Sequence, residues 1–79
     1  MKLPRDLSGA EFVKVLCKHY GYARLHQEGS HIILQTEQPV HHRLSVPDHS
    51  PLRLGTLIAI LNAVSRTQGV SKDNILAKL

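Results

Sequence analysis

Near the start of the chain, apolar residues recur at intervals of three and four positions, the spacing that places them along one side of an α-helix. This stripe consists of Phe12, Val13, Leu16, Cys17 and Tyr20. Ser8 and Glu11 precede it at the spacing of a capping box, in which the serine hydroxyl accepts from the third helical N–H. Gly21 suits the residue after a helix end. The pattern predicts a helix over residues 9–20, with Cys17 as a small buried apolar residue rather than a nucleophile.

Three segments of alternating character follow, which is typical of β-strands with one covered face. They span residues 22–28, 31–35 and 41–46. Gly29-Ser30 separates the first two and predicts a hairpin turn, and Pro47 closes the third.

The alternation also assigns the strand side chains to two faces. The apolar face would hold Ala23, Leu25, Ile32, Leu34, Leu44 and Val46. The polar face would hold Tyr22, Arg24, His26, His31, Ile33, Gln35, His41, Arg43 and Ser45. Because an apolar face has to be covered in water, we expect helices over the first face and an open second face rich in histidine and arginine.

A second helix is predicted after the strands. Ser50-Pro51 offers an N-cap followed by proline at the first helical position, and the helix would end before Gly69. Its apolar side would hold Leu54, Leu57, Ile58, Leu61 and Val64. Gly55 costs about 1 kcal/mol relative to alanine inside a helix, so we expect a packing or backbone-contact reason for it.

A short last helix is expected to start at Ser71, with Ile75, Leu76 and Leu79 on its apolar side. The order α-β-β-β-α plus a short helix predicts an α+β fold. It is a two-layer sandwich of a three-stranded antiparallel sheet with helices on one face. The 79 residues have room for a single domain, residues 1–79.

Charge narrows the class of partner. Ten lysines and arginines against six acidic residues give a formal net charge of +4, which suits a phosphate-bearing or acidic partner. Two tyrosines, one phenylalanine and no tryptophan nearly exclude a surface on which bases stack. No apolar run approaches the about 20 residues of a membrane span, the first six residues lack signal-peptide character, and the single cysteine can form no internal disulfide. We therefore expect a cytoplasmic protein that does not bind membranes.

The six histidines supply the candidate chemistry. Near neutral pH an imidazole can take a proton from one oxygen and deliver one to another, as RNA cleavage requires at the 2′-hydroxyl and the 5′-oxygen. Arg24 and Arg43 could stabilise the charge that builds on the phosphate. DNA lacks the 2′-hydroxyl, so such a site would act on RNA and not on DNA.

Simpler interpretations stay open at this point. His31 could simply open a strand beside a tight turn, and His26, His41 and His42 could be solvated polar residues. A zinc site from His26, His31 and His41 is a further alternative. Their spacing matches no known metal motif, so we expect neither a metal nor another cofactor. His41 and its neighbour His42 would point to opposite faces of the sheet.

Two groups of residues carry more specific information. The first comprises Gly21-Tyr22 and Gln27-Glu28-Gly29-Ser30-His31. The second comprises Val46-Pro47-Asp48-His49, Leu54-Gly55-Thr56-Leu57 and Ile60-Leu61. Both resemble the signatures of HicA-type toxins, the YcfA-like mRNA interferases, and they occur in the same order. The resemblance covers residues 7–79.

The resemblance implies a fold like the double-stranded-RNA-binding domain. It also implies an endoribonuclease that degrades mRNA, halts translation and is held inactive by a HicB-type antitoxin. His31 would be the catalytic residue. The expected contacts to single-stranded mRNA are Arg24, His26, Ser30, Arg43 and His49. Two positions depart from the family: His26 stands where many members carry arginine, and Glu28 where lysine or arginine is common.

Two other functions would use the same fold. A non-catalytic RNA-binding module would bind RNA in a salt-sensitive way without cleaving it. An interaction protein would only bind its partner, and Ile33, an apolar residue on the polar face, fits such a contact.

Overall fold

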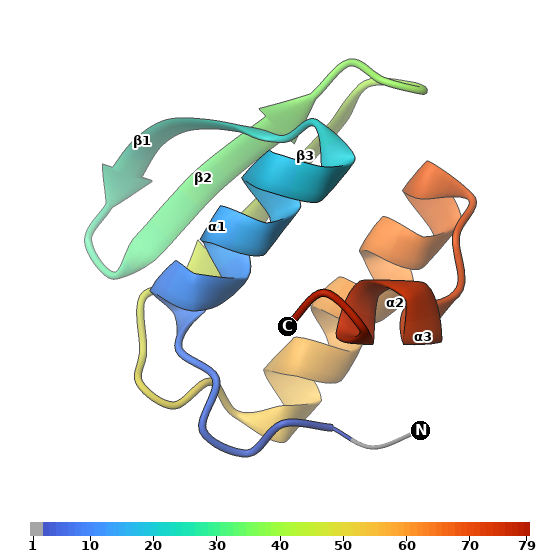
Figure 1. Ribbon diagram of the computed structural model, residues 1–79. Helices are drawn as coiled ribbons and strands as arrows, with labels where there is room; N and C mark the ends of the chain where they lie inside the picture. Colours follow the sequence, from blue (N-terminus) through green and yellow to red (C-terminus); the bar gives the residue numbers. More distant parts are fainter. Residues whose placement is uncertain (1–2) are drawn as a thin grey trace.

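The elements follow one another as a helix, three strands and two further helices (Figure 1). The computed structural model describes residues 3–79. The prediction that the first six residues lack signal-peptide character therefore falls partly, at Met1 and Lys2, outside the described residues. The elements are α1 (Gly9–Tyr20), β1 (Ala23–Glu28), β2 (His31–Thr36), β3 (His42–Pro47), α2 (Leu54–Gln68) and α3 (Lys72–Leu76). The predicted α+β order is confirmed, and each strand begins and ends within one residue of its expected bounds.

Helix α1 owes its bounds to the residues at its two ends. The Ser8 hydroxyl oxygen accepts from the Glu11 backbone N–H at 3.1 Å, and the hydroxyl donates to Glu11 Oε1 at 3.0 Å. At the other end, Gly21 takes a left-handed conformation with a φ of 73°, which glycine adopts without steric cost. The predicted helix is confirmed residue for residue.

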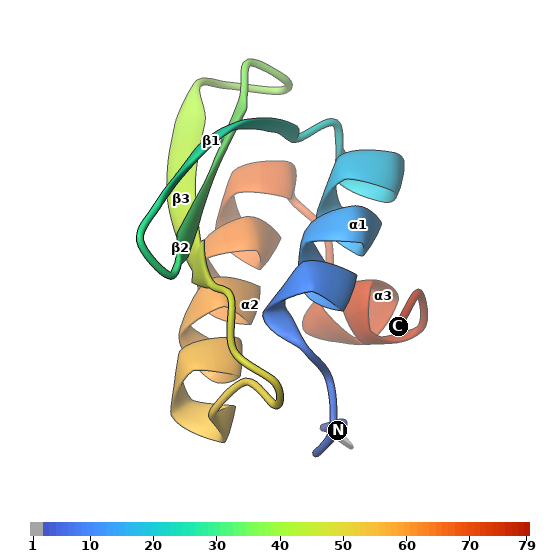
Figure 2. The ribbon, with the colours of Figure 1, turned by 90° about the vertical axis from the view of Figure 1, so that its left-hand side faces the viewer.

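The three strands form an antiparallel sheet in the order β1-β2-β3. The three helices lie on one side of this sheet (Figure 2). We call the other side the open face, because no helix or strand of residues 3–79 covers it. By the strand register, the open face carries Ala23, His26, Glu28, His31, Ile33, Gln35, Arg43, Ser45 and Pro47.

The hydrophobic core lies between the sheet and the helices. Its fully buried members are Phe12, Leu16, Ile32, Leu34, Val46, Leu57, Leu61, Val64 and Ile75. Burial of each side chain stabilises the fold by about 1.5–3 kcal/mol. The Tyr20 hydroxyl donates to Asn74 Oδ1 at 2.6 Å, which ties the end of α1 to α3. Within residues 3–79, no helix has the length and apolar character needed to cross a membrane.

A β-bulge in β1 overturns part of the expected assignment of faces. Arg24 pairs with Leu34 and His26 pairs with Ile33, so the register passes over Leu25. Arg24 therefore stands on the helix-covered side, whereas His26 belongs to the open face. The predictions that Arg24 is on the open face and that Leu25 is covered are both wrong, and Leu25 is 45% exposed.

The residues before the bulge are inverted for the same reason. Ala23 opposes Gln35 on the open face instead of facing the helices. Tyr22 is buried rather than open, and its hydroxyl contacts His42 Nδ1 at 2.7 Å. An extra residue in a strand reverses the alternation on one side of it.

Helix α2 begins later than expected. The Ser50-Pro51 pair does not cap it, because the residue before the helix is Arg53 and no side chain of the described residues caps that end. Leu52 explains the delay: its side chain is buried and its N–H donates to the Leu7 carbonyl at 2.8 Å, which holds the segment extended up to Arg53. The expected packing reason for Gly55 is also wrong, because a Cβ there would meet no atom of residues 3–79 within 4 Å.

Candidate functional site

Three rows of side chains cross the open face, one residue from each strand. Counted from the hairpin turn, they are Glu28, His31 and Pro47, then His26, Ile33 and Ser45, then Ala23, Gln35 and Arg43. Side chains directly opposite one another lie about 5 Å apart at Cβ, and diagonal neighbours are about 7–8 Å apart. The rows thus bring three of the predicted site residues, His26, His31 and Arg43, onto one surface.

His31 occupies the first position of β2, directly after the turn, and its side chain is exposed. The turn consists of Gly29 and Ser30, and Gly29 has a φ of 59°, a conformation that favours glycine. His31 lies opposite Glu28 on β1 and opposite Pro47 on β3. The imidazole is therefore accessible to a large substrate approaching the open face.

The segment after β3 holds this turn in place. The Asp48 backbone N–H donates to the Ser30 carbonyl at 2.5 Å. Gln27 Nε2 donates both to Asp48 Oδ2 at 3.2 Å and to the Gly29 carbonyl at 3.1 Å. The position of His31 thus depends on Asp48 and Gln27, which sequence reasoning missed. The sequence held one sign of this role: Gln27 is a polar residue at a position of β1 where the alternating pattern predicts an apolar one.

The segment after β3 is also hydrogen-bonded to the start of α1. The Gly9 N–H donates to the His49 carbonyl at 2.9 Å. His49 therefore supports the structure through its main chain, while its side chain is exposed. An RNA contact through the His49 side chain stays a prediction.

A shallow groove of about 330 Å³ lies on the open face, and it includes Glu28, the β1 residue that pairs with His31. Its lining residues are His26, Glu28, Ile33, Arg43, Leu44 and Ser45. On one wall, His26 Nε2 contacts Glu28 Oε1 at 2.9 Å, and Arg43 stands on the opposite strand. The groove thus combines the Arg43 guanidinium, which can bind phosphate oxygens, with the His26 imidazole, which lies next to the Glu28 carboxylate.

The site lacks two groups that the sequence placed there. The Arg24 guanidinium donates to Gln27 Oε1 at 2.7 Å on the covered side, so an RNA contact through Arg24 would have to come from the sheet edge. His41 precedes β3, and its Nδ1 pairs with Glu37 Oε2 at 2.8 Å. A zinc site from His26, His31 and His41 does not form, and the described part of the chain holds no group of three potential ligands.

His42 shows that a histidine on the covered side serves the fold. Burial lowers the pKa of His42 below its ordinary value of 6.5, and the nearby charges of His41 and Arg66 act in the same direction. Burial also raises the pKa of Tyr22, whose hydroxyl lies 2.7 Å from His42 Nδ1. The folded state therefore favours the neutral form of His42.

The stability of the protein should fall as the pH drops below about 6.5. The unfolded chain protonates His42 at a higher pH than the folded chain does, so acid favours unfolding. Urea unfolding at pH 7.5 and pH 5.5 should show this loss, and the loss should be smaller for His42→Asn, whose amide can still form a hydrogen bond with the Tyr22 hydroxyl but does not titrate. An equal loss in both proteins would contradict the assignment.

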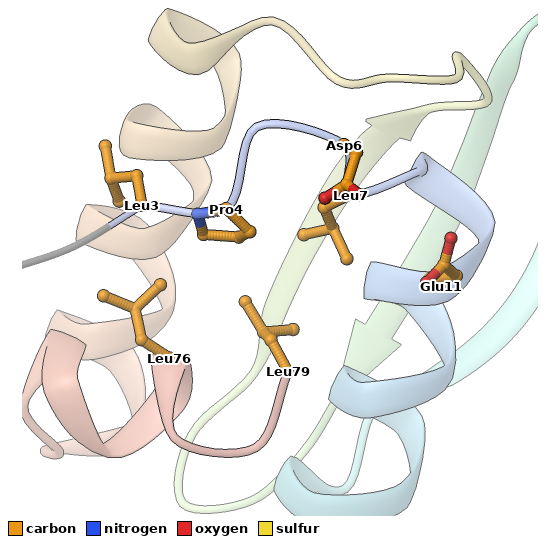
Figure 3. A pocket seen from close by; sticks show the side chains of 7 residues that line it. All are labelled: Leu3, Pro4, Asp6, Leu7, Glu11, Leu76 and Leu79. Atoms are coloured by element: carbon orange, nitrogen blue, oxygen red, sulfur yellow. The ribbon is translucent and has the colours of Figure 1, made fainter.

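A second hollow, of about 460 Å³, lies far from these rows, between the N-terminal segment, α1 and the C-terminal residues (Figure 3). Its lining residues are Leu3, Pro4, Asp6, Leu7, Glu11, Leu76 and Leu79. Leucines dominate it, and its charged groups are carboxylates, one of them already bound by Ser8. This surface would repel phosphate groups and does not belong to the candidate site.

Comparison with known proteins agrees with this picture. The family model of the HicA toxin of bacterial toxin–antitoxin systems matches residues 9–64. This range begins with α1, contains the sheet and the segment that holds the His31 turn, and ends in α2. Neither the curated proteins nor the solved structures gave a match to the chain. Because the matched range covers more than two thirds of the 79 residues, the chain belongs to the HicA toxin family.

Proposed function

We propose that this protein is a metal-independent endoribonuclease, an mRNA interferase, that cleaves single-stranded mRNA in the cytoplasm with His31 as its catalytic residue. The observation that carries the proposal is the exposed His31 imidazole on the open face, at a turn fixed by main-chain contacts to Asp48. A fixed turn gives the ring a defined approach to a bound ribose, which is what proton transfer requires.

The chemistry follows from the RNA backbone itself. His31 takes the proton of a 2′-hydroxyl, and the resulting oxygen attacks the adjacent phosphorus. Arg43 supports the developing negative charge from the groove. His26, Ser30 and His49 lie around the turn or along the groove and complete the proposed RNA contacts.

A HicB-type antitoxin is the proposed inhibitor. Ile33 forms part of the groove between β1 and β3, so an apolar side chain of a partner could seat there. The net charge of +4 would steer an acidic antitoxin toward the toxin. An antitoxin bound over the open face would exclude mRNA from His31.

Incubation of the purified protein with a labelled RNA oligonucleotide in EDTA tests the proposed activity. We expect fragments that end in a 2′,3′-cyclic phosphate and begin with a 5′-hydroxyl, and no cleavage of the matched DNA, because the 2′-hydroxyl is the nucleophile. An mRNA in a cell-free translation extract serves as the second substrate, so that a need for ribosomes does not hide the activity.

The controls separate this function from its alternatives. The HicB-type antitoxin, added in equimolar amount, should suppress cleavage. Salt-sensitive RNA binding without products in either assay would instead identify a non-catalytic RNA-binding module. Equal cleavage of DNA, or loss of activity in EDTA, would rule out metal-independent attack by the 2′-oxygen.

A further inference from the structure

The proposed reaction needs a second proton-transfer group besides His31. As the 2′-oxygen attacks phosphorus, the bond from phosphorus to the 5′-oxygen breaks, and that oxygen leaves more easily when it receives a proton. One imidazole cannot hold both positions in a single step. A side chain on the open face close to His31 could reach the same phosphodiester.

We infer that His26 is the general acid of the reaction and that Glu28 is the residue that positions it, an inference that rests on the proposed function. His26 belongs to the row next to His31 and is its diagonal neighbour across β1 and β2. Diagonal neighbours in an antiparallel pair are about 7–8 Å apart, so two imidazoles there can approach one phosphodiester from two sides.

The contact between His26 and Glu28 decides which nitrogen acts. His26 Nε2 lies 2.9 Å from Glu28 Oε1, and an ionised carboxylate only accepts hydrogen bonds. The proton on Nε2 is therefore held by Glu28 before and after the reaction. When the ring is protonated, the two residues form an ion pair and Nδ1 carries the proton that can be given away.

The groove places the remaining groups around this nitrogen. His26 and Glu28 form one wall, and Arg43 and Ser45 of β3 form the other, with Ile33 between them. A phosphate held by Arg43 would therefore lie within the space that His26 faces. Both β1 side chains are largely exposed, at 45% for His26 and 72% for Glu28, so a large RNA can reach them.

The proton balance of the step is complete. The 2′-oxygen–phosphorus bond forms while the phosphorus–5′-oxygen bond breaks. His31 receives the proton of the 2′-hydroxyl, and His26 Nδ1 gives its proton to the 5′-oxygen. The products are a 2′,3′-cyclic phosphate and a 5′-hydroxyl, and water then exchanges protons with the two rings to restore the starting state.

The bulge at Leu25 keeps Arg24 away from this pair of residues. The register passes over Leu25, so Arg24 and His26 fall on opposite sides of the sheet although they are two positions apart. The strand thus offers His26 and Glu28, rather than an arginine, to the substrate side. The two departures from the family pattern are in direct contact with each other.

A substrate that does not need an acid provides the test. In RNA whose 5′-oxygen at the cleaved bond is replaced by sulfur, the leaving thiolate departs without a proton. We expect His26→Gln to lower kcat on ordinary RNA by about 100-fold with a smaller change in KM, and to cleave the 5′-thio RNA at nearly the wild-type rate. Glu28→Gln should lose about 10-fold on ordinary RNA and recover in the same way.

Two further variants make the outcome specific. His31→Ala should be inactive on both substrates, because its base is needed in each, and His19→Gln, an exposed histidine on α1, should match the wild type on both. Equal losses of His26→Gln on both substrates, or full activity on both, would overturn the role of His26 while leaving the nuclease in place. A wild-type protein that cleaves neither substrate would refute the nuclease itself.

Discussion

Replacement of His31 by alanine should abolish RNA cleavage and restore growth to cells that express the protein, while the fold stays intact. General acid–base groups contribute about 10²–10⁴-fold to rate, so the loss should bring cleavage to the background level. The exposed position of the ring means that its removal should change the free energy of unfolding by only about 0.5 kcal/mol. Growth after induction, RNA integrity over time and thermal unfolding measure the three quantities.

His19→Ala is the matched control for this experiment. His19 is also exposed, but it lies in the last turn of α1 and not on the sheet. We expect it to remain as toxic as the wild type, which would show that loss of a surface histidine is not enough to remove toxicity. Full toxicity of the His31→Ala protein would remove this residue from the mechanism, whatever its exposure.

Replacement of Gly9 by alanine should cause the largest loss of stability among the glycine-to-alanine replacements in this protein. A Cβ at Gly9 would overlap the carbonyl oxygen of Pro47 and lie 3.3 Å from the Cα of Asp48. Both neighbours are backbone, so they cannot rotate away as a side chain would. We expect a cost of about 3 kcal/mol in the free energy of unfolding, and a Tm lower by roughly 12–24 °C.

Gly55→Ala offers a control of the opposite sign. Gly55 lies in the first turn of α2, where a methyl group would meet no atom of residues 3–79 within 4 Å. Alanine favours the helix by up to about 1 kcal/mol over glycine, so this variant should unfold at a higher temperature than the wild type. Chemical denaturation of both variants checks the pair, and equal effects would contradict the overlap at Gly9.

The activity of these two variants carries additional information. The Gly9 contact supports the segment that holds Ser30, so any folded Gly9→Ala protein should cleave RNA more slowly. Gly55→Ala should keep its activity, because the added methyl group would point into open space on the free protein. A stable but inactive Gly55→Ala protein would place RNA or another molecule against the start of α2.

The elements with local signals were predicted well from the sequence. Helix α1 has a cap at Ser8, a glycine at position 21 and a regular apolar stripe, and all three act within a few residues of one another. The hairpin turn is equally local, because Gly29 supplies the required backbone conformation. Such signals do not depend on distant parts of the chain.

The late start of α2 and the missed support of the His31 turn come from contacts between distant segments. The start of α2 depends on Leu52 binding the Leu7 carbonyl, 45 positions away, and no periodicity reports such a bond. The clamp of Asp48 on Ser30 is also long-range. The exposed turn that carries His31 could therefore be predicted from the sequence, whereas the contacts that hold this turn required the fold.

The skipped position in the first strand also affects how relatives should be compared with this chain. A HicA toxin with one residue fewer at Leu25 would present the same side chains to each side of its sheet, because the register resumes at His26. When two such chains are aligned backward from the Gly-Ser-His turn, equivalent residues match as far as position 26. Before that position, the alignment without a gap is wrong by one residue. An alignment gap at Leu25 would correct this, and residue equivalences in the preceding helix would change with it.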